Sequence, residues 1–197
     1  MAEIDFVIRG IRPLVMHNGE LADPEAEINE RLKPIQSKRG KSPEDRAELA
    51  RLEWLGGLYW DEEAGPVIPE QNIVAMLVEG ARLNKKGKDV EAFVNVTEPF
   101  VKVDYKGPRE IEKMWEAKMF DRRLVSSNGK PGGPKVVRHR PLFQPGWELK
   151  FTIAMDDDLD PKDVVEAMRQ AGKRIGLCER KKFRWGRFET VKANIRN

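Results

Sequence analysis

The clearest periodic pattern in the chain lies at residues 147–155, where apolar and polar side chains alternate. A period of two predicts a strand with one buried face. Residues 4–11 are also short and rich in β-branched side chains, and Gly10 and Pro13 bound them. We therefore expect the first strand of the fold at residues 4–11.

Three segments carry the start signals and the apolar spacing of amphipathic helices. Ser42 and Pro43, followed by acidic residues, predict a helix that runs to about residue 55. The segment 69–84 places its apolar residues on one face, as does the segment that follows the capping residue Asp160. Shorter helices are expected at residues 24–32 and directly after Pro108.

The weaker patterns complete a recognisable order of elements. Strands are expected at residues 58–60, within 92–105 and at 185–191, and residues 85–88 are expected to form a mobile basic turn. Reduced to its core, the order is strand, helix, strand, insertion, strand, helix, strand. This βαββαβ order predicts an α+β fold of the modified ferredoxin-like (RRM-like) type, with an antiparallel sheet and helices on one face. We expect one domain over residues 1–197, with a helical insertion at about 20–90.

A basic β-hairpin is predicted at about residues 120–140. The segment 126–134 is rich in serine, glycine and proline and cannot be helical, so it is expected to form a flexible tip. The flanking segments 122–125 and 135–138 are short, basic and partly apolar, which favours two strands. The hairpin is expected to protrude from the body of the protein.

The composition and the N-terminal residues argue against several kinds of site and several classes of protein. Cys178 is the single cysteine, which excludes an internal disulfide and a cysteine-based zinc site. The first residues lack the basic and apolar regions of a signal peptide, and no apolar run is long enough to span a membrane. We expect a cytoplasmic protein without a membrane partner.

The net charge of +3 hides a strong segregation of charge. Residues 121–140 contain six Lys/Arg and one acidic residue, and residues 171–197 contain nine Lys/Arg and two acidic residues. Such basic stretches are typical of proteins that bind polyanions, because phosphate contacts give affinity that does not depend on sequence. A solvated basic surface without a partner is the alternative.

Two groups of side chains are the candidate nucleic-acid contacts. The hairpin carries cations, of which Arg138 and Arg140 are expected on one face, where they can straddle a backbone; the alternative is a charged edge that prevents strand pairing. The C-terminal segment interleaves cations with aromatic rings, which suits phosphates and stacked bases, and the alternative for its rings is a place in the core. We expect Phe183 to be exposed. The candidates are Arg122, Arg123, Lys130, Lys135, Arg138, Arg140, Arg180, Lys181, Lys182, Phe183, Arg184, Trp185 and Arg187.

Two segments, residues 8–17 and 175–188, resemble the opening and closing signatures of the RAMP superfamily. That superfamily includes the CRISPR effector backbone subunits, which wrap guide RNA on a modified RNA-recognition fold with a protruding hairpin. The chain is also similar to small stand-alone phage proteins. The resemblance implies a closing loop that lies against the nucleic-acid backbone. Cys178 stands where the family usually has a second glycine.

Catalytic signals are sparse. His17 and His139 are the two histidines and the candidates for a general base, and a structural role is the alternative reading of each. The acidic run 156–160 precedes a helix, where acids favour the helix N-terminus rather than a metal. We therefore expect no cofactor and no metal.

Binding of single-stranded RNA or DNA through backbone phosphates, without catalysis, is the function that the sequence predicts. A homo-oligomer along the strand and one continuous groove formed by hairpin and closing loop are expected with it. The alternatives are a metal-independent endoribonuclease that uses His17, and a phage inhibitor or interaction protein that imitates a CRISPR subunit.

Overall fold

The computed structural model describes residues 2–126, 132–179 and 181–196. The chain forms two compact units. The first, here called the sheet unit, comprises Met1–Val15, Trp60–Gly107 and Phe143–Asn197, and the second, the hairpin unit, comprises Met16–Tyr59 and Pro108–Leu142. The residues expected as an insertion, 20–90, thus divide between the two units.

A four-stranded antiparallel sheet forms the centre of the sheet unit. Its strands are β1 (Ala2–Gly10), β5 (Val94–Val96), β9 (Glu148–Met155) and β10 (Phe188–Arg196), in the spatial order β10-β1-β9-β5. This is the strand order that a βαββαβ chain takes when each helix crosses over one face of the sheet. The expected ferredoxin-like fold is therefore confirmed.

Alternation along the two central strands places the core. Ile4, Phe6 and Ile8 on β1 are fully buried or nearly so, and the predicted inward face of β9 is buried as well. Phe6 pairs with Phe151 across the two strands, and their rings stack with centroids 5.8 Å apart. The period of two therefore gave the correct buried face for both strands.

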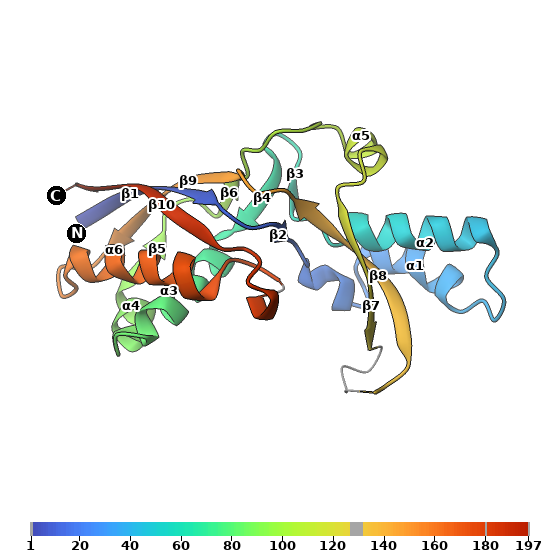
Figure 1. The fold of residues 1–197 in the computed structure, drawn as a ribbon, viewed down its shortest axis with the longest axis horizontal. Coiled ribbons are helices and arrows are strands. Elements are labelled where there is room, and N and C mark those ends of the chain that lie inside the picture. The colour runs from blue at the N-terminus through green and yellow to red at the C-terminus, as the bar shows by residue number, and fades with distance from the viewer. Residues whose placement is uncertain (1, 127–131, 180, 197) are drawn as a thin grey trace. The chain divides into compact units, whose positions relative to one another are not determined.

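Two helices, α3 (Glu70–Arg82) and α6 (Pro161–Gln170), cover one face of this sheet (Figure 1). Asp160 caps α6, since its side chain accepts a hydrogen bond from the Lys162 N–H. At Gly80 the two helices approach so closely that an added Cβ would lie 2.4 Å from the carbonyl oxygen of Ala167. A residue without a side chain is required where backbones meet at this distance.

The remaining elements of the sheet unit confirm one expectation and correct two. Two short strands, β5 and β6 (Phe100–Lys102), lie within the predicted segment 92–105. Residues 87–88, expected in a basic turn, instead begin helix α4 (Gly87–Phe93), which buries Val90. The last strand begins at Phe188 rather than at residue 185. The smaller elements are β2 (Leu14–Val15), β3 (Trp60–Asp61), β4 (Gly65–Pro69), a π-helical turn (Ala171–Ile175) and a 3-10 turn (Lys181–Phe183).

The hairpin unit combines helices with a long β-hairpin. It contains a 3-10 turn (Gly19–Ala22), α1 (Glu27–Gln36), α2 (Pro43–Leu55), α5 (Ile111–Glu116), β7 (Phe120–Ser126) and β8, which starts the return at Lys135 and ends at Phe143. The pair β7–β8 is the predicted hairpin, and α1 lies three to four residues later than the expected segment 24–32. Leu32, Ile35 and Leu52 form the buried contact between α1 and α2.

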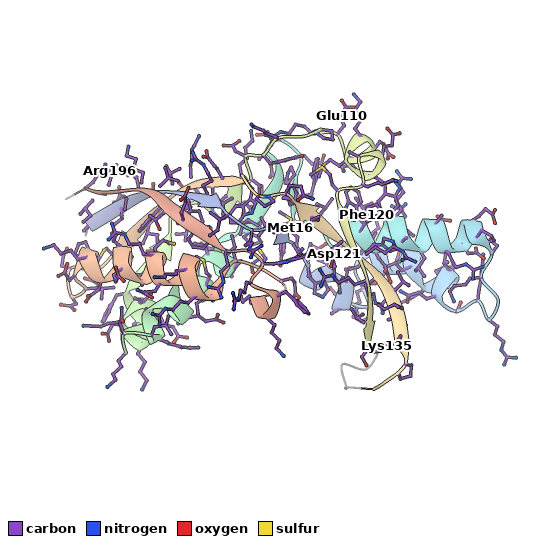
Figure 2. All side chains as sticks on the ribbon, in the orientation of Figure 1. Met16, Glu110, Phe120, Asp121, Lys135 and Arg196 are labelled. Carbon is purple, nitrogen blue, oxygen red and sulfur yellow. The ribbon has the colours of Figure 1, made fainter. Side chains whose placement is uncertain are left out.

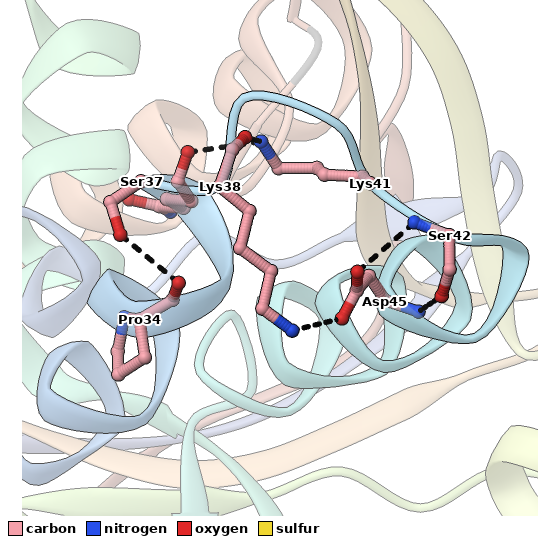
Figure 3. A network of polar contacts seen from close by, with 7 residues as sticks. Pro34, Ser37, Lys38, Lys41, Ser42 and Asp45 are labelled. Atoms are coloured by element: carbon pink, nitrogen blue, oxygen red, sulfur yellow. Dashed lines mark hydrogen bonds and ion pairs between the residues drawn. The ribbon is translucent and has the colours of Figure 1, made fainter.

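The start of α2 follows the capping signal read from the sequence. Ser42 accepts a hydrogen bond from the Asp45 N–H at 3.1 Å, and the Asp45 carboxylate accepts one from the Ser42 N–H at 3.0 Å (Figure 3). Lys38 adds an ion pair to the same carboxylate at 2.5 Å. These contacts hold the pKa of Asp45 below its usual value, the hydrogen bond from Lys38 being the largest cause. The cap fixes where α2 begins and so which of its side chains face the hairpin.

Candidate nucleic-acid interface

The register of the hairpin sorts its cations onto two faces. Arg123 lies opposite Arg138, and Asp121 lies opposite Arg140, whereas Arg122 lies opposite His139. Directly opposed residues of an antiparallel pair share a face. Arg138 and Arg140 therefore lie on one face, as the alternation in the sequence predicts.

Two acidic side chains contact the cations of that face, Glu53 from α2 and Asp121 from the hairpin itself. Arg138 donates to the carboxylate of Glu53 on α2, whose side chain is only 5% exposed, and the two form an ion pair. The Arg123 Nε donates to Asp121 at 2.8 Å. A phosphate at Arg138 must therefore compete with a buried carboxylate that is already in place. The assignment of Arg123 and Arg138 to nucleic-acid binding stays a prediction.

His17 lies beside Arg140. Its Nε2 is 3.4 Å from the Arg140 Nη2, and its backbone carbonyl accepts a hydrogen bond from the Tyr59 hydroxyl at 3.0 Å. Asp23, which is near His17 in sequence, accepts instead from the Glu25 N–H. The catalytic role of His17 stays a prediction.

The opposite face of the hairpin carries an aromatic cluster. The Phe120 ring meets His139 edge-on with centroids 5.2 Å apart, and it lies 4.9 Å from the ring of Trp115 on α5. Trp115 in turn contacts Trp54, which is fully buried and donates from its indole to the Met119 carbonyl at 2.9 Å. Trp54 therefore supports Trp115 from the core, and Trp115, Phe120 and His139 remain half-buried.

A groove of about 770 Å³ opens beside this cluster, within the hairpin unit. One wall is α2, and the other is formed by α5 and the hairpin; Figure 2 labels Phe120 and Asp121 at the start of β7. We call it the hairpin groove, and its lining residues are Gln36, Lys41, Arg46, Ala47, Leu49, Ala50, Glu53, Trp115, Phe120, Arg122, Val136, Val137, Arg138 and His139.

Arg46 and Arg122 are the exposed cations of the hairpin groove. Across residues 2–126, 132–179 and 181–196, no acidic side chain forms an ion pair with either of them. Lys41 is committed to the turn between α1 and α2, because its ammonium donates to the carbonyls of Gln36 and Lys38 at 3.0 and 2.9 Å (Figure 3). Sequence reasoning proposed Arg122 but missed Arg46, Trp115 and Phe120, since helix and hairpin positions reveal no shared groove.

The pKa of His139 is lowered, first by its burial and second by the positive charge of Arg122. Removing that charge by Arg122→Ala is therefore expected to raise the pKa of His139. A pH titration of the imidazole signals by NMR measures the change. Lys135→Ala removes a cation from the same hairpin face, farther from His139 in the register, and should have a smaller effect. Equal shifts in the two variants would contradict the assigned cause.

In the sheet unit, the closing loop (residues 176–187) is held by contacts between backbones. The Leu177 N–H donates to the Gly186 carbonyl at 2.9 Å, and the Gly186 N–H donates to the Pro13 carbonyl at 2.7 Å. Gly176 and Gly186 have φ of 93° and 70°, and a Cβ on Gly186 would lie 2.0 Å from the Leu177 carbonyl oxygen. The two glycines fit both the positive φ and the close approach.

Cys178 adopts the conformation that glycine favours, with φ of 59°. The position where the RAMP pattern has a second glycine therefore keeps a left-handed backbone despite its side chain. Asn72 donates to the Cys178 sulfur at 3.7 Å, and burial raises the pKa of the thiol to about 12.

The side chains of the closing loop differ in their exposure. Lys182, Phe183 and Arg184 are exposed, and Phe183 keeps 58% of its surface accessible, which confirms the expectation for that ring. Lys181 instead forms an ion pair with Glu79 at 3.0 Å, and the Arg187 guanidinium donates to the Lys173 carbonyl.

The other predicted residues differ in burial and position. Trp185 is half-buried and lies before β10, not within it. Burial, and after it the charge of Arg184, lowers the pKa of Arg187. On the hairpin, Lys135 is exposed. Lys130 and Arg180 lie outside the described residues.

Among the described residues, no group of three or more His, Cys, Asp or Glu side chains is placed to hold a metal ion. In the acidic run, Asp160 is the cap of α6, as expected. Of the helices in the described part of the chain, none has the length and apolar character needed to cross a membrane.

The fold is similar to that of a chain in a solved structure, the cryo-EM structure of the Type III-B Cmr-beta bound to cognate target RNA. The TM-score is 0.54 and the sequence identity is 15%. The match covers 98% of this chain and 60% of that chain, so the present chain spans about three fifths of its length. No protein-family model and no curated protein matches the sequence. At this identity the likeness shows the fold alone, and it agrees with the modified ferredoxin-like fold expected from the sequence.

Proposed function

We propose that the protein binds single-stranded nucleic acid through its backbone phosphates, without cleaving it. This proposal is carried by the exposure of three neighbouring side chains in the closing loop, Lys182, Phe183 and Arg184. Backbone hydrogen bonds hold the loop that presents them. Two cations bind phosphates, and an exposed ring between them offers a surface on which a base can stack. The preorganised loop lowers the entropy cost of ordering these groups on binding.

RNA is the preferred ligand in this proposal. The chain shares its fold with a chain of a complex that holds target RNA, and single-stranded RNA is recognised by stacking and phosphate contacts on sheets of this class. Arg122 and Lys135 on the hairpin add exposed cations that a strand can contact. Whether hairpin and closing loop contact the same strand, and whether copies assemble along it, stay predictions.

The double variant Lys182→Ala/Arg184→Ala tests the proposal. Because these side chains contact phosphates, affinity for single-stranded RNA should fall for every sequence. The slope of log K against log salt should flatten by about 1.4, which is about 0.7 for each cation on a single strand. Fluorescence anisotropy with a labelled 12-mer at several salt concentrations measures both quantities, and single-stranded DNA of the same length compares the two ligands.

The matched control is Lys88→Ala/Lys102→Ala, which removes the same charge from exposed positions of α4 and β6 in the sheet unit. It should leave the salt slope nearly unchanged. If wild-type protein binds neither RNA nor DNA at low salt, or if the two double variants behave alike, the closing loop is not a phosphate-binding surface.

A further inference from the structure

We propose that the hairpin groove binds an unstacked nucleobase of the strand, with Phe120 and Trp115 as the stacking surface and Arg46 and Arg122 on the flanking phosphates. This inference rests on the proposed function and deepens it. The closing loop accounts for phosphate affinity, whereas the hairpin groove supplies contacts to bases themselves.

The aromatic surface has the shape that this role needs. Phe120 and Trp115 lie 4.9 Å apart with an interplanar angle of 34°, so the two rings are tilted rather than perpendicular to one another. Both rings are half-buried and both line the groove. Contact with Trp54, which is fully buried, fixes Trp115 from below. A groove of about 770 Å³ is of the size of known small-molecule sites, and it is large enough for a base with its sugar.

The charge around the rings fits an anionic backbone. Arg46 projects from α2 and Arg122 from β7, so guanidiniums stand on both walls of the groove. Glu53 lines the groove too, but its carboxylate is paired with Arg138. The lowered pKa of His139 leaves its ring uncharged at neutral pH, as part of the aromatic surface.

Aromatic rings flanked by guanidiniums distinguish a nucleic acid from an acidic peptide. A peptide would meet the same cations, but it has no repeated flat π-faces between its charges. Base–aromatic stacking contributes about 1–3 kcal/mol per base and tolerates every base identity. The groove is therefore expected to recognise the presence of a base and not its sequence.

The test compares two strands that carry the same phosphates. One is a 12-nucleotide single-stranded RNA, and the other is the same length of abasic backbone. Wild-type protein should bind the RNA about 10-fold more tightly, as expected for one or two stacked bases. Phe120→Leu keeps an apolar side chain in place but removes the ring, and it should bring the affinity ratio close to one. The closing-loop double variant should bind both strands more weakly and keep the ratio of the two affinities.

Leu124→Ala is the control on the hairpin, because Leu124 lies on the same face of β7 as Phe120, is 67% exposed and does not line the groove. It should keep the wild-type ratio, and thermal melting verifies that each variant is folded. A second measurement needs no substitution at all: the imidazole signals of His139 should shift with RNA and not with the abasic strand.

The outcomes distinguish failure of the base-binding groove from failure of the proposed phosphate binding. Equal binding of both strands by wild type, an unchanged ratio in folded Phe120→Leu, or identical His139 shifts with both strands overturns the base-binding groove, while phosphate binding stands. If neither strand binds, the proposed function fails and the inference fails with it.

Discussion

Replacing Gly186 by alanine is expected to destabilise the sheet unit by about 2–5 kcal/mol. Two costs add up in this variant. A side chain at a φ of 70° meets the strain of the left-handed region, which costs roughly 1–2 kcal/mol, and the new Cβ would overlap the Leu177 carbonyl oxygen, so the packed loop must shift at a cost of about 1–3 kcal/mol. Equilibrium denaturation in urea measures the change.

Gly146→Ala separates these two costs. Gly146 has a φ of 99° but nothing within 4 Å of an added Cβ. It should therefore show the backbone cost alone, about 1–2 kcal/mol. If Gly186→Ala is no more destabilising than Gly146→Ala, the close backbone approach that shapes the closing loop is not important for stability.

Arg138→Ala is expected to destabilise the hairpin unit by about 3 kcal/mol, because it leaves the buried carboxylate of Glu53 without its partner. Arg122→Ala, on the same hairpin but exposed, should change the free energy of unfolding by less than about 0.5 kcal/mol. Urea denaturation followed by the fluorescence of the tryptophans in this unit compares the two. The comparison separates a structural arginine from one that is available to a ligand.

The double variant Glu53→Leu/Arg138→Ala tests whether the unpaired carboxylate of Glu53 causes this loss of stability. Removing both charged groups takes away the unpaired carboxylate, so the double variant should be more stable than Arg138→Ala alone. If the double variant loses as much free energy of unfolding as two large single losses added together, Arg138 stabilises the hairpin by packing and not by neutralising Glu53.

The sequence predicted those elements whose signals are local. The alternation at residues 147–155, the Ser42 cap and the turn-rich tip of the hairpin each depend on neighbouring residues, and the structure confirms strand β9, helix α2 and the pair β7–β8. The element α4 was missed because a helix of seven residues with one buried valine has too few turns to show a period.

The candidate site was harder to predict, because it depends on residues that are distant in the sequence. Glu53 neutralises Arg138 from a different element, and Arg46 shares a groove with Phe120 only because α2 lies along the hairpin. Counting charges along the chain treats every arginine alike. It could not distinguish Arg138, which forms an ion pair with a buried carboxylate, from Arg122, which forms no ion pair in the described part of the chain.

The position of β1 has a consequence for folding during synthesis. Both strands that flank β1 in the sheet, β9 and β10, come much later in the sequence. Ile4, Phe6 and Ile8 therefore remain without their sheet partners until those two strands have been made, and such long-range pairing is slow. Until then the growing chain exposes this apolar segment, which favours aggregation.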